Sequence, residues 1–197
     1  MTICVPSMTG PGQVPASNAR CVILLGHSEG VMHIARLAEA GAPPPAAVIG
    51  IGAPMGAPVD IVRWQMSGRD VCSLKAMDED RDGRITTTEV ERNWRRTPSS
   101  FLDMIEPLKH PSGAWGEADL DAVTQAQAAL YGQQRQAALV LDDAAPYPNA
   151  ATPMARSSWW KSWFTDDQPV GRRLARWKVP VRLHYGESDS QTPPHGE

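Results

Sequence analysis

The chain has 197 residues, which is enough for one ordinary domain or slightly more. Hydrophobic residues make up 42% of it, so a buried core is expected and wholesale disorder is excluded. Its 19 basic and 22 acidic residues give a net charge of −3, which disfavours a nucleic acid as partner. No apolar run approaches the roughly 20 residues that cross a bilayer, and no signal peptide is visible.

The first structured part of the chain is expected to follow a disordered leader. Residues 1–20 are polar and broken by prolines and glycines. The apolar runs 21–25 and 46–51 fit strands that are buried on both faces of a parallel sheet. Between them, apolar residues recur at helical spacing from Gly30 until Gly41, which is typical of a C-cap. Strand, helix and strand in succession predict a βαβ unit.

The middle of the chain has a different pattern. Residues 59–163 carry mostly helical signals interrupted by prolines, with one or two helices expected within 116–141. A short helix and then a strand follow within residues 170–185. The predicted class is therefore α/β, with a parallel sheet built from two segments, 21–58 and 164–197, and a mainly helical insertion between them.

The strongest short signal is Gly-His-Ser-Glu-Gly at residues 26–30, a G-x-S-x-G pattern between a predicted strand and helix. The chain must reverse sharply there, so Ser28 is expected to have a strained backbone, and side chains at Gly26 and Gly30 would collide with neighbouring backbone. The Ser28 hydroxyl would then stand above the sheet, with the Glu29 N–H aimed at a developing oxyanion. A chance match in a loop is the alternative, which the flanking strand and helix disfavour.

This stretch resembles the nucleophile elbow of the α/β-hydrolase family. Residues 178–193 resemble the family's late strand and acid-bearing turn, in the pattern P-V-x-x-x-x-G-x-x-D-x-x-x-P. By that match Asp189 is the triad acid, which would orient a histidine and stabilise its cation; a turn-capping Asp189 is the alternative. The resemblance covers 21–58 and 159–193, and it implies a serine hydrolase that acts on a small-molecule ester, a thioester or a peptide.

The resemblance leaves the triad histidine unplaced. No histidine of the chain stands where the family has its own: His27, His33, His110, His184 and His195. The family's early strands, and the loop that gives the second oxyanion donor, also have no counterpart. We therefore expect a chain truncated at both ends relative to the family. It should have low stability and little or no activity, because a central strand without neighbours exposes unpaired edges.

A second strong signal lies inside the insertion, where residues 78–89 match the EF-hand loop D-x-D-x-D-G-x-I-x-x-x-E. The expected ligands are the carboxylates of Asp78, Asp80, Asp82 and Glu89, the backbone carbonyl of Arg84, and Thr86 through its hydroxyl or a water. Carboxylates crowded in this way repel one another without a cation, so Ca²⁺ is the predicted cofactor. An acidic, solvated turn is the alternative.

Two functions follow from these motifs. The loop lies where the hydrolase family inserts its cap, so Ca²⁺ would order the cap of a serine hydrolase and shape substrate access. The alternative is a non-catalytic calcium-binding EF-hand module. Ile85 in such a loop normally pairs with a second loop, and the sequence shows only one. A calcium loop hints at an exported parent protein, but location and oligomeric state stay open.

Overall fold

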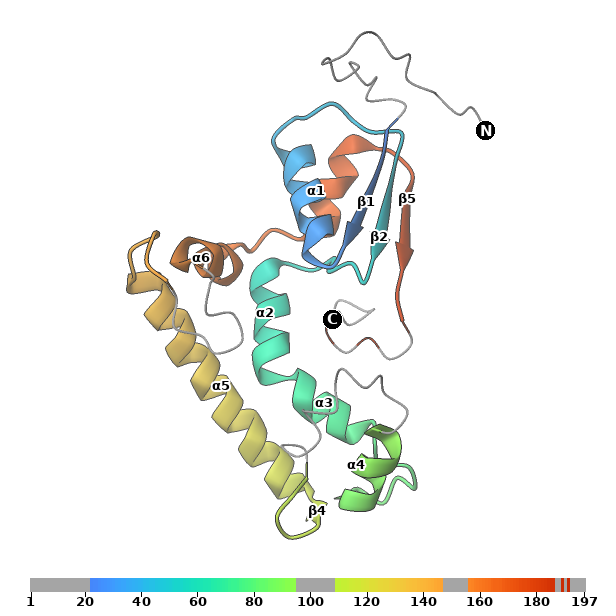
Figure 1. Ribbon diagram of the computed structural model, residues 1–197, viewed down its shortest axis with the longest axis vertical. Coiled ribbons are helices and arrows are strands. Elements are labelled where there is room, and N and C mark those ends of the chain that lie inside the picture. Colours follow the sequence, from blue (N-terminus) through green and yellow to red (C-terminus); the bar gives the residue numbers. More distant parts are fainter. Residues whose placement is uncertain (1–21, 95–108, 147–155, 187–188, 190, 192–197) are drawn as a thin grey trace, which may run out of the picture. The chain divides into compact units, whose positions relative to one another are not determined.

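The structure is a computed structural model that describes residues 22–94, 109–146, 156–186, 189 and 191 (Figure 1). The predicted leader, 1–20, lies outside these residues. The described parts combine helices with a small parallel sheet, which confirms the α/β class. No helix among them is both long and apolar enough to pass through a membrane. The chain divides into two compact units, and each is described by itself.

The first unit, Met1–Ile61 with Thr165–Glu197, holds a three-stranded parallel sheet. Its strands, in spatial order, are β1 (Ile23–His27), β2 (Ala47–Ile51) and β5 (Val181–His184). β1 and β2 pair in parallel through the intervening helix α1 (Glu29–Glu39), which confirms the predicted βαβ unit. β5 then pairs in parallel with the other edge of β2.

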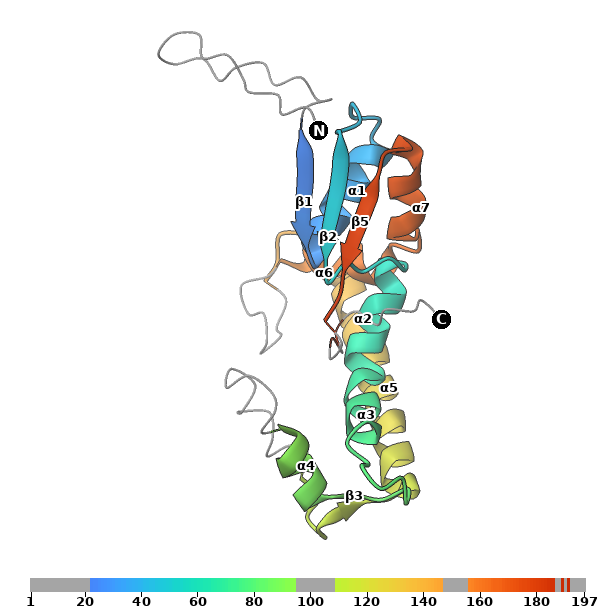
Figure 2. The same cartoon turned by 90° about the vertical axis from the view of Figure 1, so that its right-hand side faces the viewer.

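Two helices cover one face of this sheet, α1 and the short α7 (Val170–Leu174), which continues into a 3-10 turn at Ala175–Trp177 (Figure 2). Val31 of α1, Val48 of β2 and Val170 of α7 are fully buried. A Cβ added to Gly50 would come within 2.9 Å of Ala53 and Leu183. The centre of β2 therefore needs a glycine so that its neighbours can approach.

The opposite face of the sheet is open in the described part of the chain. Ile23 and Leu25 of β1 are 58% and 62% exposed, and Ile51 of β2 is 41% exposed. Because side chains alternate along a strand, these residues share the face that α1 and α7 leave uncovered. The prediction that both faces are buried is thus wrong for the residues described, because helices pack on one side alone.

An ion-pair network ties α7 to α1. Arg173 is buried, and its Nη1 and Nη2 donate to the Asp166 carboxylate at 2.7 and 2.5 Å. Arg36 of α1 donates to the same carboxylate at 3.4 Å. Arg173 Nε lies 2.9 Å from Glu39 Oε2, an ion-pair distance without hydrogen-bond geometry. Burial alone would raise the pKa of Asp166, but the hydrogen bonds from Arg173 and other donors outweigh it and lower this pKa.

The second unit, Val62–Phe164, is mainly helical. Its helices are α2 (Pro58–Ser67), which starts in the first unit, α3 (Arg69–Lys75), α4 (Thr87–Trp94), α5 (Glu117–Val140) and α6 (Ser157–Thr165). Two short strands, β3 (Ile85–Thr86) and β4 (Ala114–Trp115), form an antiparallel pair. The region predicted to be helical therefore also contains a small sheet.

Two clusters of apolar side chains hold this unit together. One cluster gathers around residues 78–89 and consists of Val71, Leu74, Met77, Ile85, Val90 and Leu120, with Trp115 and Val123 packed against it. The other joins α5 to α6, where Trp160 stacks on Phe164 at 5.5 Å and Tyr131 meets Phe164 edge-on at 5.8 Å. Leu120 of α5 thus belongs to the first cluster and Tyr131 of α5 to the second, so this helix joins the two.

Candidate functional site

β1 runs directly into α1 at Ser28, whose backbone has φ 50° and ψ −122°. A positive φ is rare for residues with a side chain and marks a strained turn. Two backbone hydrogen bonds hold it: Ser28 N donates to Ile51 O at 2.9 Å, and Val31 N donates to Ser28 O at 3.1 Å. The half-buried Ser28 therefore sits on a sharp strand-to-helix corner that is anchored on the neighbouring strand.

The two glycines of the pattern differ in their surroundings. A Cβ at Gly26 would lie 2.7 Å from Val31 N and 2.8 Å from the carbonyl carbon of Gly30, so the expected collision exists there. A Cβ at Gly30 would meet nothing within 4 Å outside its own helix, so the expected collision at that position is wrong. The sharp bend brings the start of α1 over Gly26, whereas Gly30 already faces open space.

Ser28 occupies the N-cap position of α1, but its side chain makes no capping hydrogen bond. Serine is a favoured N-cap because its oxygen usually accepts a backbone N–H of the first helical turn. Glu29 follows as the first residue of the 11-residue helix, and its Oε1 lies 3.6 Å from His33 Nε2.

Asp189 and Ser28 follow strands that end at the same edge of the sheet. His27, Ile51 and His184 pair across β1, β2 and β5. Strands lie about 4.8 Å apart, so the ends of β1 and β5 are separated by about 10 Å. Asp189 N donates to Gly186 O, and its half-buried carboxylate accepts Gln191 N at 3.0 Å. Asp189 therefore stabilises a turn, as the alternative interpretation expected, on the edge where the elbow lies.

Tyr185 stands between the strand and this turn. Its hydroxyl donates to Ala53 O at 2.9 Å, which joins the end of β5 to the loop after β2. Burial, and then the negative charge of Asp189, raise the pKa of the Tyr185 hydroxyl. The phenol therefore keeps its proton and serves as a donor at the carboxyl edge of the sheet.

The structure assigns no histidine to this pair. Among the residues that it describes, no hydrogen bond joins the Ser28 hydroxyl to an imidazole. His27 and His184 are exposed at the ends of β1 and β5, and His33 pairs with Glu29. His110 belongs to the second unit, and His195 lies outside the described residues.

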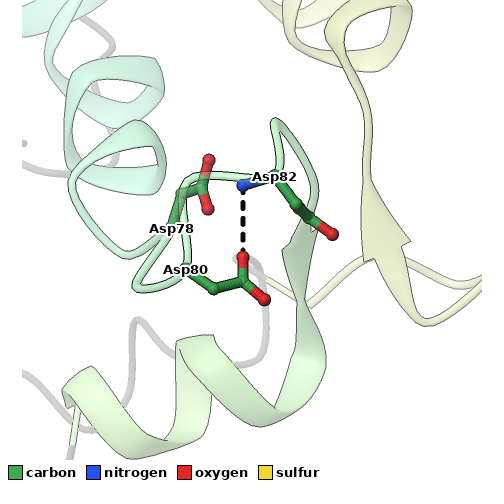
Figure 3. A group of neighbouring side chains, drawn as sticks. All are labelled: Asp78, Asp80 and Asp82. Carbon is green, nitrogen blue, oxygen red and sulfur yellow. Dashed lines mark hydrogen bonds between the residues drawn. The ribbon is translucent and has the colours of Figure 1, made fainter.

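The acidic loop of the second unit brings three carboxylates together. One oxygen each from Asp78, Asp80 and Asp82 lies within 4.8 Å of the others (Figure 3). The side chains also fold the loop, because Asp80 Oδ1 accepts Asp82 N at 3.2 Å and Asp78 Oδ2 accepts Gly83 N at 3.0 Å. Gly83 has φ 81°, the left-handed conformation that the bend requires. Arg84 N donates to Asp82 Oδ1 at 2.7 Å.

The donor set suits a hard divalent cation. Asp78 Oδ1 is buried and has no hydrogen-bond partner, which is unfavourable for a carboxylate oxygen. Ca²⁺ prefers oxygen ligands and accepts carboxylates and backbone carbonyls together. Asp80 and Asp82 are exposed, so a cation has access to the loop from solvent.

Glu89, by contrast, holds the two ends of the loop together. Its buried carboxylate accepts Glu79 N at 2.9 Å through Oε1, and Thr86 N and Oγ1 at 2.8 and 2.7 Å through Oε2. The hydrogen bonds from Thr86, followed by weaker ones, outweigh desolvation and lower the pKa of Glu89. The Glu89 carboxylate and the Thr86 hydroxyl are thus bonded to each other.

Two features beside the loop were missed in the sequence. Ile85 pairs with Trp115 across β3 and β4, and the spacing Gly113-x-Trp115, which repeats Gly83-x-Ile85, is a signal that could have revealed it. A cavity of about 430 Å³ adjoins the loop, and its lining residues are Lys75, Asp78, Gly83, Ile85, Glu117, Leu120 and Asp121. Glu117 and Asp121 in this lining place further carboxylates near the loop, and Lys75 places one ammonium group there.

Comparison with models of known protein families, with curated proteins and with solved structures returns no match for this chain.

Proposed function

We propose that the protein is a serine hydrolase of the α/β-hydrolase type, with Ser28 as its nucleophile. The observation that carries the proposal is the backbone of Ser28, which has a positive φ at a strand-to-helix corner with Gly26 packed beneath it. A serine that merely began a helix would have an ordinary backbone and would cap the first turn. Ser28 has a strained backbone and makes no capping hydrogen bond. A hydroxyl that has to reach a substrate would explain this strain.

The reaction would proceed through an acyl-enzyme. The Ser28 oxygen forms a bond to the substrate carbonyl carbon, and the Glu29 N–H at the start of α1 stabilises the negative charge on the carbonyl oxygen. A histidine takes the serine proton and passes it to the leaving alcohol, thiol or amine. Asp189 orients that histidine, which is not assigned to a residue of this chain. Water then cleaves the acyl ester and regenerates Ser28.

A fluorophosphonate probe tests this proposal because it phosphonylates activated serines. Because no histidine among the described residues bonds to Ser28, we expect slow labelling of the folded protein and none of Ser28→Ala. The matched control is Ser67→Ala, which removes a hydroxyl that donates to Arg63 O at the end of α2 and should leave labelling unchanged. No labelling of the folded protein, or labelling that survives in Ser28→Ala, would rule out the nucleophile.

The acidic loop favours calcium binding as a second function, either within a hydrolase cap spanning residues 59–163 or in a non-catalytic module. The observation behind it is the convergence of Asp78, Asp80 and Asp82, with Asp78 Oδ1 buried and unpartnered. Asp78, Asp80 and Asp82 would hold the ion, and the Arg84 carbonyl, Thr86 and Glu89 would complete the ligand set. Ca²⁺ would supply the charge that balances the loop.

Calorimetric titration with Ca²⁺ tests this second function. We expect binding to the protein and none to the double variant Asp80→Asn, Asp82→Asn, since it removes two carboxylate charges. Asp142→Asn is the matched control: this exposed residue of the same unit accepts Ala144 N, and an asparagine can keep that bond. Equal binding by all three proteins would contradict a site in this loop.

A further inference from the structure

The calcium loop packs against a second loop of the same unit. Ile85 pairs with Trp115 and Thr86 with Ala114 in the antiparallel β3–β4 ladder. Thr87 extends the contact, because its backbone N and its Oγ1 donate to Gly113 O at 2.9 and 3.1 Å. The two loops thus lie side by side, joined through their strands.

The second loop repeats the backbone of the first, thirty residues further along the chain. Gly83 precedes Ile85 by two positions and has φ 81°; Gly113 precedes Trp115 by two positions and has φ 91°. In each loop a left-handed glycine therefore makes the bend that leads into the short strand.

Both loops also enter their helices in the same way. Thr86 N donates to Glu89 Oε2 at 2.8 Å at the start of α4, and Gly116 N donates to Asp119 Oδ2 at 2.9 Å at the start of α5. In each case a carboxylate three residues on accepts the N–H of the residue after the paired strand position. The same turn, strand and cap therefore occur twice.

The loops differ where the cation would bind. Asp80 and Asp82 of the first loop correspond to His110 and Ser112 of the second. His110 Nδ1 lies 2.6 Å from Ser112 Oγ and accepts Ser112 N at 3.2 Å. Hydrogen bonds between His110 and Ser112 therefore hold these positions. They lack the repulsion between neighbouring carboxylates that a cation offsets in the first loop.

We infer that residues 109–119 are the metal-free half of a two-loop module, and that Trp115 is a positioning residue for the calcium loop. The inference rests on the proposed calcium binding. Ile85 is 2% exposed and stands between Arg84 and Thr86, two expected ligands. By pairing with Ile85, Trp115 fixes the strand from which those ligands are presented, although it contributes no ligand itself.

Calcium calorimetry on matched tryptophan variants tests this role. We expect one ion per chain, and roughly a tenfold loss of affinity in Trp115→Ala, as for other residues that orient metal ligands. Trp115→Phe, which keeps an aromatic ring opposite Ile85, should recover most of that affinity. Trp159→Ala removes another half-buried tryptophan of the unit, from α6, and should leave affinity unchanged.

Hydrogen exchange of the Thr87 amide gives a readout that needs no variant. We expect Ca²⁺ to slow its exchange, because the bond to Gly113 O crosses between the loops. Unchanged exchange upon measured binding, unchanged affinity in Trp115→Ala, or two equivalent ions would overturn the inference and leave calcium binding standing. A wild-type protein that binds no Ca²⁺ would instead overturn the calcium proposal, and this inference with it.

Discussion

The Ser28 turn and the acidic loop are both tight turns into a helix, but different forces hold them. At Ser28 the turn is fixed by one backbone hydrogen bond to β2, by one within the turn, and by the close approach of α1 to Gly26, with no charged group in these contacts. In the acidic loop, carboxylates accept the loop's own N–H groups. The Ser28 turn therefore depends on the sheet around it, whereas carboxylates within residues 78–89 close the acidic loop.

The largest effect that would separate the two regions is expected from Arg173→Ala. Removing this buried guanidinium leaves the Asp166 carboxylate without its main partner, and breaking a buried ion pair costs about 3 kcal/mol or more. We expect hydrogen exchange to accelerate in β2 and to stay unchanged in α3, which belongs to the other unit. Lys161→Ala, which breaks a more exposed pair with Asp143, is the control with a small effect. Equal acceleration of exchange in β2 and in α3 would mean that the two units do not unfold separately.

Gly26→Ala should have the next largest effect and should act on the elbow alone. The new Cβ would meet backbone at 2.7 Å, and such overpacking costs about 1–3 kcal/mol. Gly30→Ala, whose Cβ has open space, is the matched control and should be neutral or stabilising, because alanine favours a helix more than glycine does. Urea denaturation of both variants measures the difference, and equal stabilities would show that the turn is not tightly packed.

Addition of Ca²⁺ should stabilise the region around the acidic loop. At about 100 times its dissociation constant, a ligand that binds the folded state alone adds about 2.7 kcal/mol of stability. We expect this gain in the exchange of α3 and α4 amides and no change at the amides of β1 and β2. Mg²⁺, which accepts such flexible oxygen sites less readily, serves as the comparison ion. A calcium effect of equal size in both units would contradict a site confined to the loop.

The smallest predicted effect is a loss of folding stability at acidic pH. Hydrogen bonds from Thr86 lower the pKa of Glu89 below its ordinary 4.5. A carboxyl whose folded-state pKa is depressed stabilises the fold above its unfolded pKa, and that stability is lost as pH falls through the lower, folded value. The stability gained from Glu89 should therefore be complete at neutral pH and decline below about pH 4.5. The Thr86 amide shift in an NMR titration reports this step, and Glu89→Gln should abolish it. A transition above pH 4.5 would mean that folding raises the pKa of Glu89, which would contradict the prediction.

Short-range patterns account for what could be predicted in this chain. Gly26, Ser28 and the apolar runs beside them determine the local backbone over a few residues. The βαβ unit predicted from them is present. The spacing of Asp78, Asp80 and Asp82 likewise depends on adjacent backbone alone, and their oxygens do lie together. A strand also forms within the expected segment, at Val181–His184, and its place beside β2 supports the α/β class.

Other features depended on partners far away in the sequence. The apolar pattern of β1 could not reveal that Ile23 and Leu25 are exposed in the described part of the chain, because such a run looks the same with one covered face or two. Trp115 became the partner of Ile85 only through the β3–β4 pairing, which joins segments thirty residues apart. Glu89 matches a ligand position, and only the structure shows that its carboxylate accepts the N–H groups of Glu79 and Thr86.

The amino-acid order by itself therefore determined the local chemistry: a serine between glycines at a corner, and aspartates alternating around a bend. Only the tertiary structure decided what surrounds them, namely the strand that anchors Ser28, the turn role of Asp189, and the loop that supports Ile85. The physical reason is range. Backbone strain and neighbouring carboxylates act within a few bonds, whereas burial and strand pairing select among distant segments that the order of residues leaves unspecified.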